Sequence, residues 1–258
     1  MDLGLKDRRA LVMGSTRGMG NAIARGLAAE GARVAVCGRD PADAEAAAKK
    51  IGGSVSAYGL DLANDASVTA LIASLEANFG GLDLILCNGG GPPPGNVSDV
   101  TAEVWQAQFQ TMFVNQTRIV NAFLSGMRES GHGRVLILAS SGVVQPIPNL
   151  GISNSLRGAL LGWGKTLAAE VAGDGVTVNM ILPGRIHTDR VNQIDEAAAQ
   201  RQGKTVEEVV RASQAMIPAG RYGTAEEFAD VAVFLFSASA GYVTGSVIRV
   251  DGGLIRSV

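Results

Sequence analysis

The chain has 258 residues, of which 47% are hydrophobic and 18% charged. This composition excludes extended disorder and indicates a globular protein with a large core. The 22 Lys and Arg residues nearly balance the 24 Asp and Glu residues, for a net charge of −2. We therefore expect no nucleic-acid partner and no polybasic membrane surface.

Short β-rich runs alternate with alanine-rich helical stretches along nearly the whole chain. Near-continuous apolar runs are typical of parallel strands that are covered on both faces. Helix starts are indicated by Asp40-Pro41 and by two capping-box spacings, Thr205…Glu208 and Thr224…Glu227. We predict an α/β fold, a Rossmann-type doubly wound parallel seven-stranded sheet with helices on both faces. The strands are predicted at Arg9–Met13, Arg33–Cys37, Ser54–Tyr58, Leu82–Cys87, Arg134–Ala139, Val176–Leu182 and Val247–Val250.

No composition shift, internal repeat or low-complexity tract divides the chain, so residues 1–258 are predicted to form a single domain. Two segments interrupt the alternation of strands and helices. Gly89–Gly95 is a stiff loop of glycine and proline after the fourth strand, and Asp189–Gly220 is a polar helical segment after the sixth. Ligands bind beyond the carboxyl ends of the strands in open α/β sheets, so both segments should overhang that site. Residues 189–220 are predicted to form a substrate lid.

Neither a secretion signal nor a membrane span is recognisable in the sequence. Charged residues interrupt the start of the chain, and the longest apolar candidate, Val231–Phe236, is far shorter than the roughly 20 residues that a span needs. Cys37 and Cys87 each follow an apolar run and are expected to be reduced core thiols, not a disulfide or a metal pair. We expect a soluble, cytoplasmic protein without a metal site.

A glycine-rich bend follows the first predicted strand and leads directly into an alanine-rich helix. Glycine permits positive φ and a close backbone approach to a pyrophosphate, and the helix N-terminus supplies unpaired N–H groups. Because a strand precedes the bend and a helix follows it, we favour dinucleotide binding over a glycine-rich turn without a ligand. The predicted cofactor-binding residues of this loop are Gly14, Ser15, Thr16, Arg17, Gly18, Met19 and Gly20.

The end of the second predicted strand bears on the choice between NAD and NADP. An acidic residue there is typical of NAD binding, because it accepts hydrogen bonds from the ribose. This strand instead ends Cys37-Gly38-Arg39, and Arg39 with Arg17 could pair with a 2′-phosphate. Two alternatives stay open: both arginines are solvated, or Asp40 accepts from a ribose instead of capping the next helix. NADP(H) is preferred over NAD(H).

Several short motifs occur in a fixed order along the chain. The glycines of the first loop are followed by Asp61-Leu62, Asn88-Gly89-Gly90, Pro183-Gly184 and Asp251-Gly252-Gly253. Together these motifs resemble the short-chain dehydrogenase/reductase family, and above all its 3-oxoacyl-ACP-reductase-like branch. The resemblance implies a Rossmann fold, a nicotinamide cofactor and a homo-oligomer, either a tetramer or a dimer. It also implies cofactor contacts by Asp61, Leu62, Asn88, Gly89, Gly90, Pro183, Gly184, Ile186 and Thr188.

The family's catalytic tetrad of asparagine, serine, tyrosine and lysine is altered here. Alignment on residues 162–168 places Ser153 and Arg157 at the tyrosine and lysine positions of the family's YxxxK motif. Ser140 precedes Ser153 by 13 residues, the family's usual interval, so the tetrad serine is retained. Met112 falls at the asparagine position, and Asn115, one helical turn further on, is the candidate to point the same way. The predicted catalytic residues are Ser140, Ser153, Arg157 and Asn115.

These substitutions weaken acid catalysis. A serine hydroxyl is a much poorer proton donor than a phenol, and a guanidinium does not deprotonate at working pH. Arg157 could still stabilise an oxyanion or bind a substrate carboxylate or phosphate, and Arg185 and Arg190 also hint at an anionic substrate. His187 is the other candidate acid, although a non-catalytic loop histidine is the more common case.

Two functions remain open. The first is an NADP(H)-dependent oxidoreductase that reduces a ketone or a conjugated carbonyl, with a 3-oxoacyl thioester or an anionic keto acid among the candidate substrates. The second is a catalytically impaired dinucleotide-binding protein with a regulatory or assembly role, because three of the tetrad residue types are replaced. Fold analogy does not separate these from other reactions, such as dehydration or epimerisation.

Overall fold

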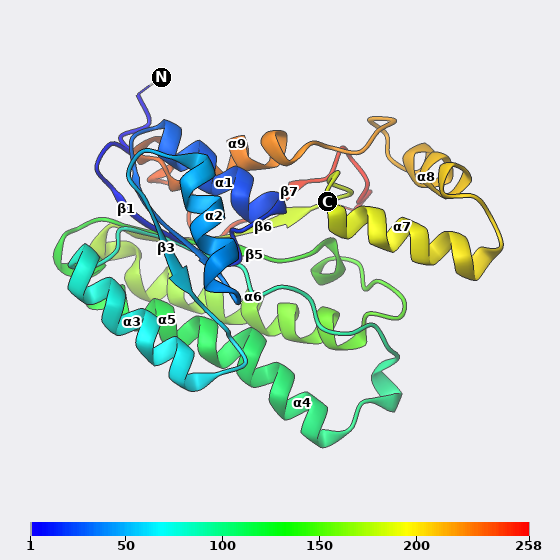
Figure 1. Ribbon diagram of the computed structural model, residues 1–258, viewed down its shortest axis with the longest axis horizontal. Coiled ribbons are helices and arrows are strands. Elements are labelled where there is room, and N and C mark those ends of the chain that lie inside the picture. The colour runs from blue at the N-terminus through cyan, green and yellow to red at the C-terminus, as the bar shows by residue number, and fades with distance from the viewer. Residues whose placement is uncertain (1, 258) are drawn as a thin grey trace.

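The computed structural model describes residues 2–257 and contains one seven-stranded sheet in which every strand pair is parallel (Figure 1). The strand order is β3-β2-β1-β4-β5-β6-β7, so the direction of winding reverses between β1 and β4. This arrangement confirms the predicted fold class. The strands are β1 (Arg9–Val12), β2 (Arg33–Gly38), β3 (Val55–Gly59), β4 (Leu84–Cys87), β5 (Gly133–Leu138), β6 (Val176–Pro183) and β7 (Val247–Val250).

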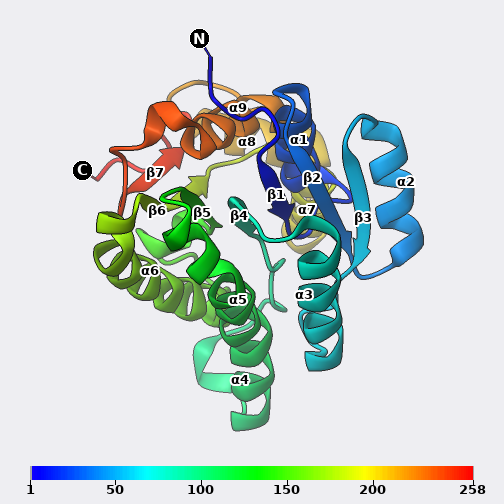
Figure 2. The same ribbon diagram turned by 90° about the vertical axis from the view of Figure 1, so that its left-hand side faces the viewer.

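Helices cover both faces of the sheet, as Figure 2 shows in a view turned by 90°. The bounds are α1 (Gly18–Ala29), α2 (Pro41–Ile51), α3 (Asp65–Phe79), α4 (Ala102–Phe109), α5 (Asn115–Glu129), α6 (Gly151–Val171), α7 (Asp189–Gln202), α8 (Val206–Ala215) and α9 (Ala225–Phe236). Core residues of α1, α2 and α9 form one hydrophobic layer, and those of α3, α5 and α6 form the other. The sheet is therefore buried on both sides, which explains its nearly continuous apolar strands.

Alternation along a strand distributes side chains between the two layers. In β1, Ala10 and Val12 pack into the layer with α1 and α9, whereas Leu11 packs into the layer with α3 and α5. This period of two follows from the pleated geometry of a strand. The loops after the strands thus start from a rigid frame.

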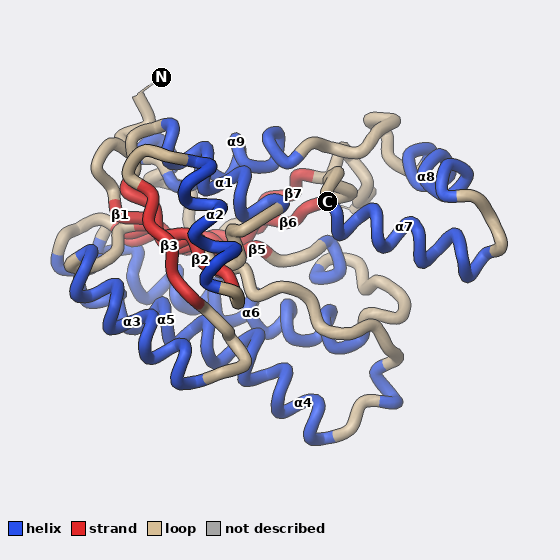
Figure 3. Tube along the Cα trace, viewed as in Figure 1, coloured by secondary structure: helices blue, strands red, loops and turns tan. Residues whose placement is uncertain are grey.

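The loops that follow the strands lie at the carboxyl edge of the sheet, together with α7 and α8. Figure 3 shows α7 and α8 projecting past this edge, far from α2 and α3. The Gly89–Gly95 segment lies beside the segment before α6, because Gly95 pairs with Leu150 and its carbonyl accepts from Gly151 at 3.1 Å. A π-helical turn, Gln110–Val114, joins α4 to α5. The described helices include none long and apolar enough to cross a membrane.

Candidate functional site

The loop between β1 and α1 has the backbone that a bound pyrophosphate requires. Gly14 and Gly18 both have φ of +60°, a conformation that favours glycine. Gly20 lies directly under Gly14, and a Cβ atom at Gly20 would collide with the Gly14 carbonyl oxygen. The first turn of α1 carries no acidic residue, so its N–H groups are free to face an anion.

Ser15 fixes the conformation of this loop through hydrogen bonds to β1 and β2. It is fully buried; its hydroxyl donates to the Val12 carbonyl at 2.6 Å and accepts from the Cys37 N–H at 2.9 Å. Its own N–H donates to the Cys37 carbonyl at 3.0 Å. We predicted a cofactor contact for Ser15, but its hydroxyl and N–H are already occupied within the protein, so it holds the loop to β2 instead.

The end of β2 presents cationic side chains beside the loop. Arg17 and Arg39 are exposed, and within residues 2–257 neither side chain has a hydrogen bond or ion pair. Asp40 accepts from the Ala42 N–H at 2.9 Å and thereby caps α2. Of the two alternatives for Asp40, the structure shows the helix cap. The two arginines are thus the free charged groups at this corner.

The loops after β3 and β4 complete one side of the site. Asn88 donates to the Gly14 carbonyl at 3.2 Å, which joins the β4 loop to the β1 loop. Asp61 accepts from the Ala63 N–H at 3.0 Å, and Leu62 is buried at 8% exposure. Gly90 has φ of +71° and is exposed. The contact that joins the loop after β4 to the phosphate loop is thus the one made by Asn88.

A buried glutamine, which sequence reasoning missed, lies under Gly89. A Cβ atom at Gly89 would fall 2.5 Å from Gln116 Nε2, so glycine is needed there. Gln116 donates this amide to the Met112 carbonyl, and its Oε1 is buried without a hydrogen-bond partner among the described residues. No motif in the sequence signals this contact, because it depends on the π-helical turn before α5.

The loop after β6 closes the opposite side. Gly184 donates to the Val250 carbonyl at 2.9 Å, and a Cβ atom there would meet the Asp251 backbone, so the loop lies tightly against the end of β7. Pro183 is the last residue of β6, and Ile186 is buried. Thr188 comes within contact distance of Gly18, because a Cβ atom at Gly18 would lie 3.7 Å from Thr188 Cγ2. The loop after β6 and the loop after β1 are therefore neighbours at Thr188 and Gly18.

Arg157 is buried beside this site and is bound entirely by protein atoms. Its Nη1 donates to the Leu138 carbonyl at 2.9 Å and its Nη2 to the Gly90 carbonyl at 2.8 Å. Its Nε donates to Ser153 Oγ at 3.2 Å, one turn earlier on α6. Burial lowers the pKa of Arg157 to about 10, so the group stays charged at neutral pH. These contacts leave no support for the expectation that Arg157 binds a substrate carboxylate or phosphate bidentately.

Ser140 lies between β5 and α6, in the same region as Ser153. Its Oγ accepts from the Gly142 N–H at 3.1 Å. Gly142 in turn packs against Asn154, whose amide exchanges hydrogen bonds with the backbone of Ile147 at 2.9 and 3.3 Å. Asn154, another residue that sequence reasoning missed, therefore braces the loop that carries Ser140 against the start of α6.

Asn115 is hydrogen bonded on the side of α3, and these contacts give no support to its predicted catalytic role. Its amide donates to the Leu62 carbonyl and to Asp65 Oδ1, both at 2.9 Å, and is fully buried. Met112 instead faces α6, where it packs with Ile152 and Leu156. The π-helical turn separates the directions of Met112 and Asn115, so the assumption of one regular helical turn fails.

The segment after Thr188 is attached to the site through a buried carboxylate. Asp195 of α7 is 1% exposed, accepts from the Tyr222 hydroxyl at 2.9 Å and pairs with Arg185 Nη1 at 3.2 Å. Arg185 is therefore partnered within the protein. The Asp195–Tyr222–Arg185 cluster fastens α7 to the loops beside the site.

Replacing Asp195 by alanine is expected to loosen α7 without unfolding the sheet. It removes two hydrogen bonds that the carboxylate accepts, together worth about 2 kcal/mol, so amide exchange in α7 should accelerate about 10- to 100-fold. Hydrogen exchange read by mass spectrometry measures this directly, with the exposed neighbour Glu196→Ala as the matched control. Unchanged exchange in α7 of the Asp195 variant would show that apolar packing alone holds the segment.

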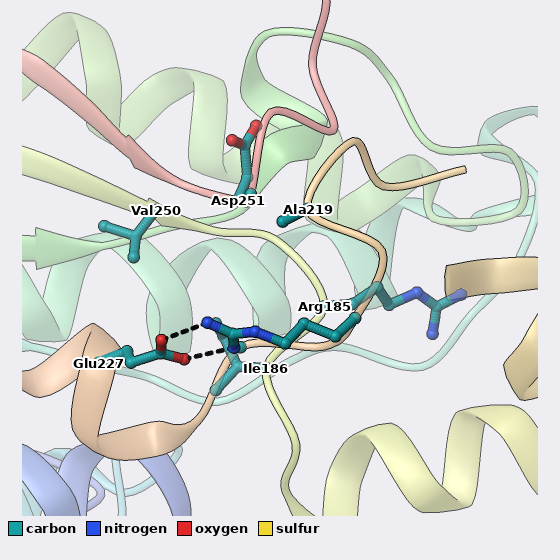
Figure 4. A pocket seen from close by; sticks show the side chains of 9 residues that line it. Arg185, Ile186, Ala219, Glu227, Val250 and Asp251 are labelled. Carbon is teal, nitrogen blue, oxygen red and sulfur yellow. Dashed lines mark hydrogen bonds and ion pairs between the residues drawn. The ribbon is translucent and has the colours of Figure 1, made fainter. Parts of the chain in front are cut away.

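A separate hollow of about 140 Å³ lies behind the β6 loop (Figure 4). Its wall includes Arg221, whose guanidinium donates to both Glu227 oxygens at 2.6 and 2.8 Å. Ligand pockets usually enclose roughly 300–1,000 Å³, so this hollow is too small for a dinucleotide. His187, the candidate acid, is exposed near this loop. The residues of the described chain form no cluster suited to a metal ion, and Cys37 and Cys87 are free and buried.

The fold and the glycine loop define a nucleotide-binding α/β protein of the Rossmann type. Residues 14–255 match the family model described as enoyl-(acyl carrier protein) reductase. The 3-oxoacyl-(acyl-carrier-protein) reductase of Escherichia coli (strain K12) is 33% identical over 247 residues, 95% of this chain and 96% of that protein. The structure of L-sorbose reductase from Gluconobacter frateurii complexed with NADPH and L-sorbose matches at 31% identity and a TM-score of 0.94, over 100% of both chains.

A further solved structure, described as a short chain dehydrogenase/reductase family protein, is 31% identical with a TM-score of 0.83, covering 98% of this chain and 99% of that one. The chain belongs to the short-chain dehydrogenase/reductase family. This confirms the resemblance drawn from its motifs. The Escherichia coli relative and the Gluconobacter frateurii protein are both reductases, and the structure of the latter contains NADPH.

Proposed function

We propose that this protein is an NADP(H)-dependent oxidoreductase that reduces a ketone or a conjugated carbonyl at an altered catalytic site. The preference for NADP(H) over NAD(H) rests on one observation at the end of β2. Within residues 2–257 the side chains of Arg17 and Arg39 have no hydrogen bond or ion pair, and Asp40 caps α2. Two guanidinium groups suit a 2′-phosphate, whereas NAD binding typically uses a free carboxylate there. The NADPH in the L-sorbose reductase structure supports the same choice.

The test of this proposal is the replacement of Arg39 by alanine. A charge-assisted contact to phosphate contributes about 1.5–3 kcal/mol, so NADPH affinity should fall about 10- to 100-fold while NADH affinity stays nearly the same. Fluorescence titration with each cofactor measures the two affinities. Arg128→Ala is the control, because Arg128 is also exposed but pairs with Asp174 at 2.6 Å, far from the site. Equal losses for both cofactors would refute a 2′-phosphate contact.

The catalytic part of the proposal assigns Ser140 and Ser153 to the substrate carbonyl and Arg157 to a supporting position. Ser153 and Arg157 are taken to occupy the tyrosine and lysine positions of the family's motif. The contacts of Arg157 with Ser153 and with Gly90 support this placement, because Gly90 belongs to the proposed cofactor wall. A 3-oxoacyl thioester is a candidate substrate because a relative is a 3-oxoacyl reductase. An anionic keto acid has less support, since Arg157 and Arg185 are partnered within the protein.

The second candidate, a dinucleotide-binding protein without turnover, is favoured by one observation. Met112, at the family's asparagine position, is 2% exposed in an apolar cluster and cannot take part in a polar relay. One measurement distinguishes the two candidate functions. Once NADPH binding is demonstrated, an oxidoreductase should consume NADPH with a carbonyl or enone substrate, and a binding protein without turnover should not.

The lid and the assembly state remain predictions. The buried Asp195 cluster supports a lid formed by residues 189–220, because it joins α7 to the β6 loop. A homo-oligomer, tetramer or dimer, is supported by exposed apolar side chains near the edge strand β7, Tyr242 and Val247.

A further inference from the structure

We propose that Gln116 is a positioning residue for the cofactor site: its side chain fills the space under Gly89 and thereby sets the position of the loop after β4. This inference rests on the proposed function, in which Asn88, Gly89 and Gly90 line the cofactor site. It adds a residue outside the glycine motifs, on which the affinity for both NADPH and NADH should depend.

The loop after β4 is held at three consecutive residues. Asn88 donates to a carbonyl of the phosphate loop at 3.2 Å, and the Gly90 carbonyl accepts from Arg157 Nη2 at 2.8 Å. Gly89 lies between these two hydrogen bonds, and a Cβ atom on it would fall 2.5 Å from Gln116 Nε2. Gln116 therefore limits how closely the middle of this loop can approach α5.

The amide of Gln116 has little room to move away from Gly89. Gln116 is 2% exposed, and its Nε2 donates to the Met112 carbonyl. Moving the amide would break this hydrogen bond inside a close-packed interior, whereas the loop is partly exposed at Gly89 and exposed at Gly90. An added methyl group at Gly89 should therefore displace the loop and not the glutamine.

The π-helical turn before α5 gives this glutamine a firm base. Met112, within the turn, packs with Ile152 and Leu156 of α6. Asn115, which directly follows the turn, donates to the Leu62 carbonyl in the loop after β3 at 2.9 Å. π-helical turns are frequent at functional sites, and this one is held both to α6 and to the loop after β3. It thus places two consecutive amide side chains against two of the proposed cofactor loops.

The buried oxygen of the amide indicates that Gln116 acts through its volume. Its Oε1 has no hydrogen-bond partner among the described residues. Because such an acceptor lowers stability, an apolar side chain of the same shape can be neutral or stabilising. Gln116→Met should therefore keep Tm at or above that of the parent protein and leave the affinity for NADPH nearly unchanged. A folded Gln116→Met protein that loses this affinity would contradict a role through volume.

The test measures the affinities of the full-length protein for NADPH and NADH by fluorescence titration. Gly89→Ala should lower both affinities about 10- to 100-fold, the effect of one methyl group added to a packed contact. Its Tm should change little, because the partly exposed loop can shift in the free protein. Arg39→Ala, by contrast, should weaken the binding of NADPH alone. Gly91→Ala is the matched control, because this exposed glycine is two residues further on and a Cβ atom there would meet nothing within 4 Å.

A second substitution distinguishes a positioning role from general damage to the fold. Adding Gln116→Ala to the Gly89→Ala protein removes the atoms that the methyl group would meet, so the double variant should bind NADPH at least about 10-fold more tightly than Gly89→Ala alone. Gln116→Val replaces Gln116→Ala if the alanine protein does not fold, since valine also lacks the Cδ and Nε2 atoms that lie within 3.0 Å.

Two results would overturn the positioning role and leave the proposed function standing. One is a Gly89→Ala protein that binds NADPH as tightly as the Gly91→Ala control, and the other is a folded double variant that binds no more tightly than Gly89→Ala. A parent protein that binds neither NADPH nor NADH would instead count against the proposed function itself.

Discussion

Replacing Gly20 by valine is expected to lower the affinity for NADPH by more than 100-fold. A Cβ atom at Gly20 would collide with the Gly14 carbonyl oxygen and would come 3.2 Å from Asn88 Nδ2, which donates to that same carbonyl. The loop cannot move away cheaply, because Gly14 is at φ +60° and Ser15 is hydrogen bonded to Val12 and Cys37. The N–H groups that should face the pyrophosphate would then be displaced together.

Fluorescence titration measures the affinity, and thermal unfolding shows whether the variant folds. Gly126→Ala is the matched control, because this exposed glycine lies inside α5 and a Cβ atom there would meet nothing within 4 Å. Alanine at an open helical position should raise the stability by about 0.5–1 kcal/mol and leave NADPH binding unchanged. A folded Gly20→Val protein that still binds NADPH with native affinity would contradict the assigned phosphate loop.

Features that depend on neighbours in sequence were predictable. The cap of α2 joins Asp40 to Ala42, two residues apart, and the capping boxes of α8 and α9 each span three residues. The five inner strands were predictable because burial on both faces gives them nearly continuous apolar runs, whereas the edge strands β3 and β7 are partly exposed. The glycine loop was predictable for the same local reason, since its conformation is encoded by glycine itself.

The orientation of the polar side chains was not predictable, because their partners are remote. Arg157 contacts residues 19 and 67 positions away, and Asn115 contacts residues 50 and 53 positions away. Met112 lies within a π-helical turn, for which the sequence has no recognisable signal, and this turn changes the angle between Met112 and the residues of α5. The spacing along the helix therefore could not reveal that Asn115 binds Leu62 and Asp65, or that the Arg157 guanidinium donates to three protein acceptors.

Replacing Arg157 by methionine is expected to lower the free energy of unfolding by about 3 kcal/mol and kcat by at least about 100-fold. The change in the free energy of unfolding is the sum of two opposing effects, relief of desolvation and loss of hydrogen bonds. Burial lowers the pKa of Arg157 from 12.5 to about 10, so removing the cation relieves a desolvation cost of about 3 kcal/mol. The variant also leaves the Leu138 and Gly90 carbonyls and Ser153 Oγ without their donor, at about 1–3 kcal/mol each, and this loss is the larger.

The fall in kcat should be larger than the loss of folded protein can explain. Arg157 links Ser153 to the loop at Gly90 and supplies a positive charge beside the serine hydroxyl. Arg157→Lys keeps the charge but cannot reach all three acceptors, so it should recover part of kcat with little change in KM. Denaturant unfolding gives the stability, and Lys165→Met on the exposed side of α6 is the control, since Lys165 donates only to the Gly245 carbonyl at 2.9 Å. Because Arg157 is charged in both the folded and unfolded chain below about pH 10, the stability difference should be constant from pH 6 to 9. An Arg157→Met protein as stable as the parent would show that desolvation outweighs the three hydrogen bonds.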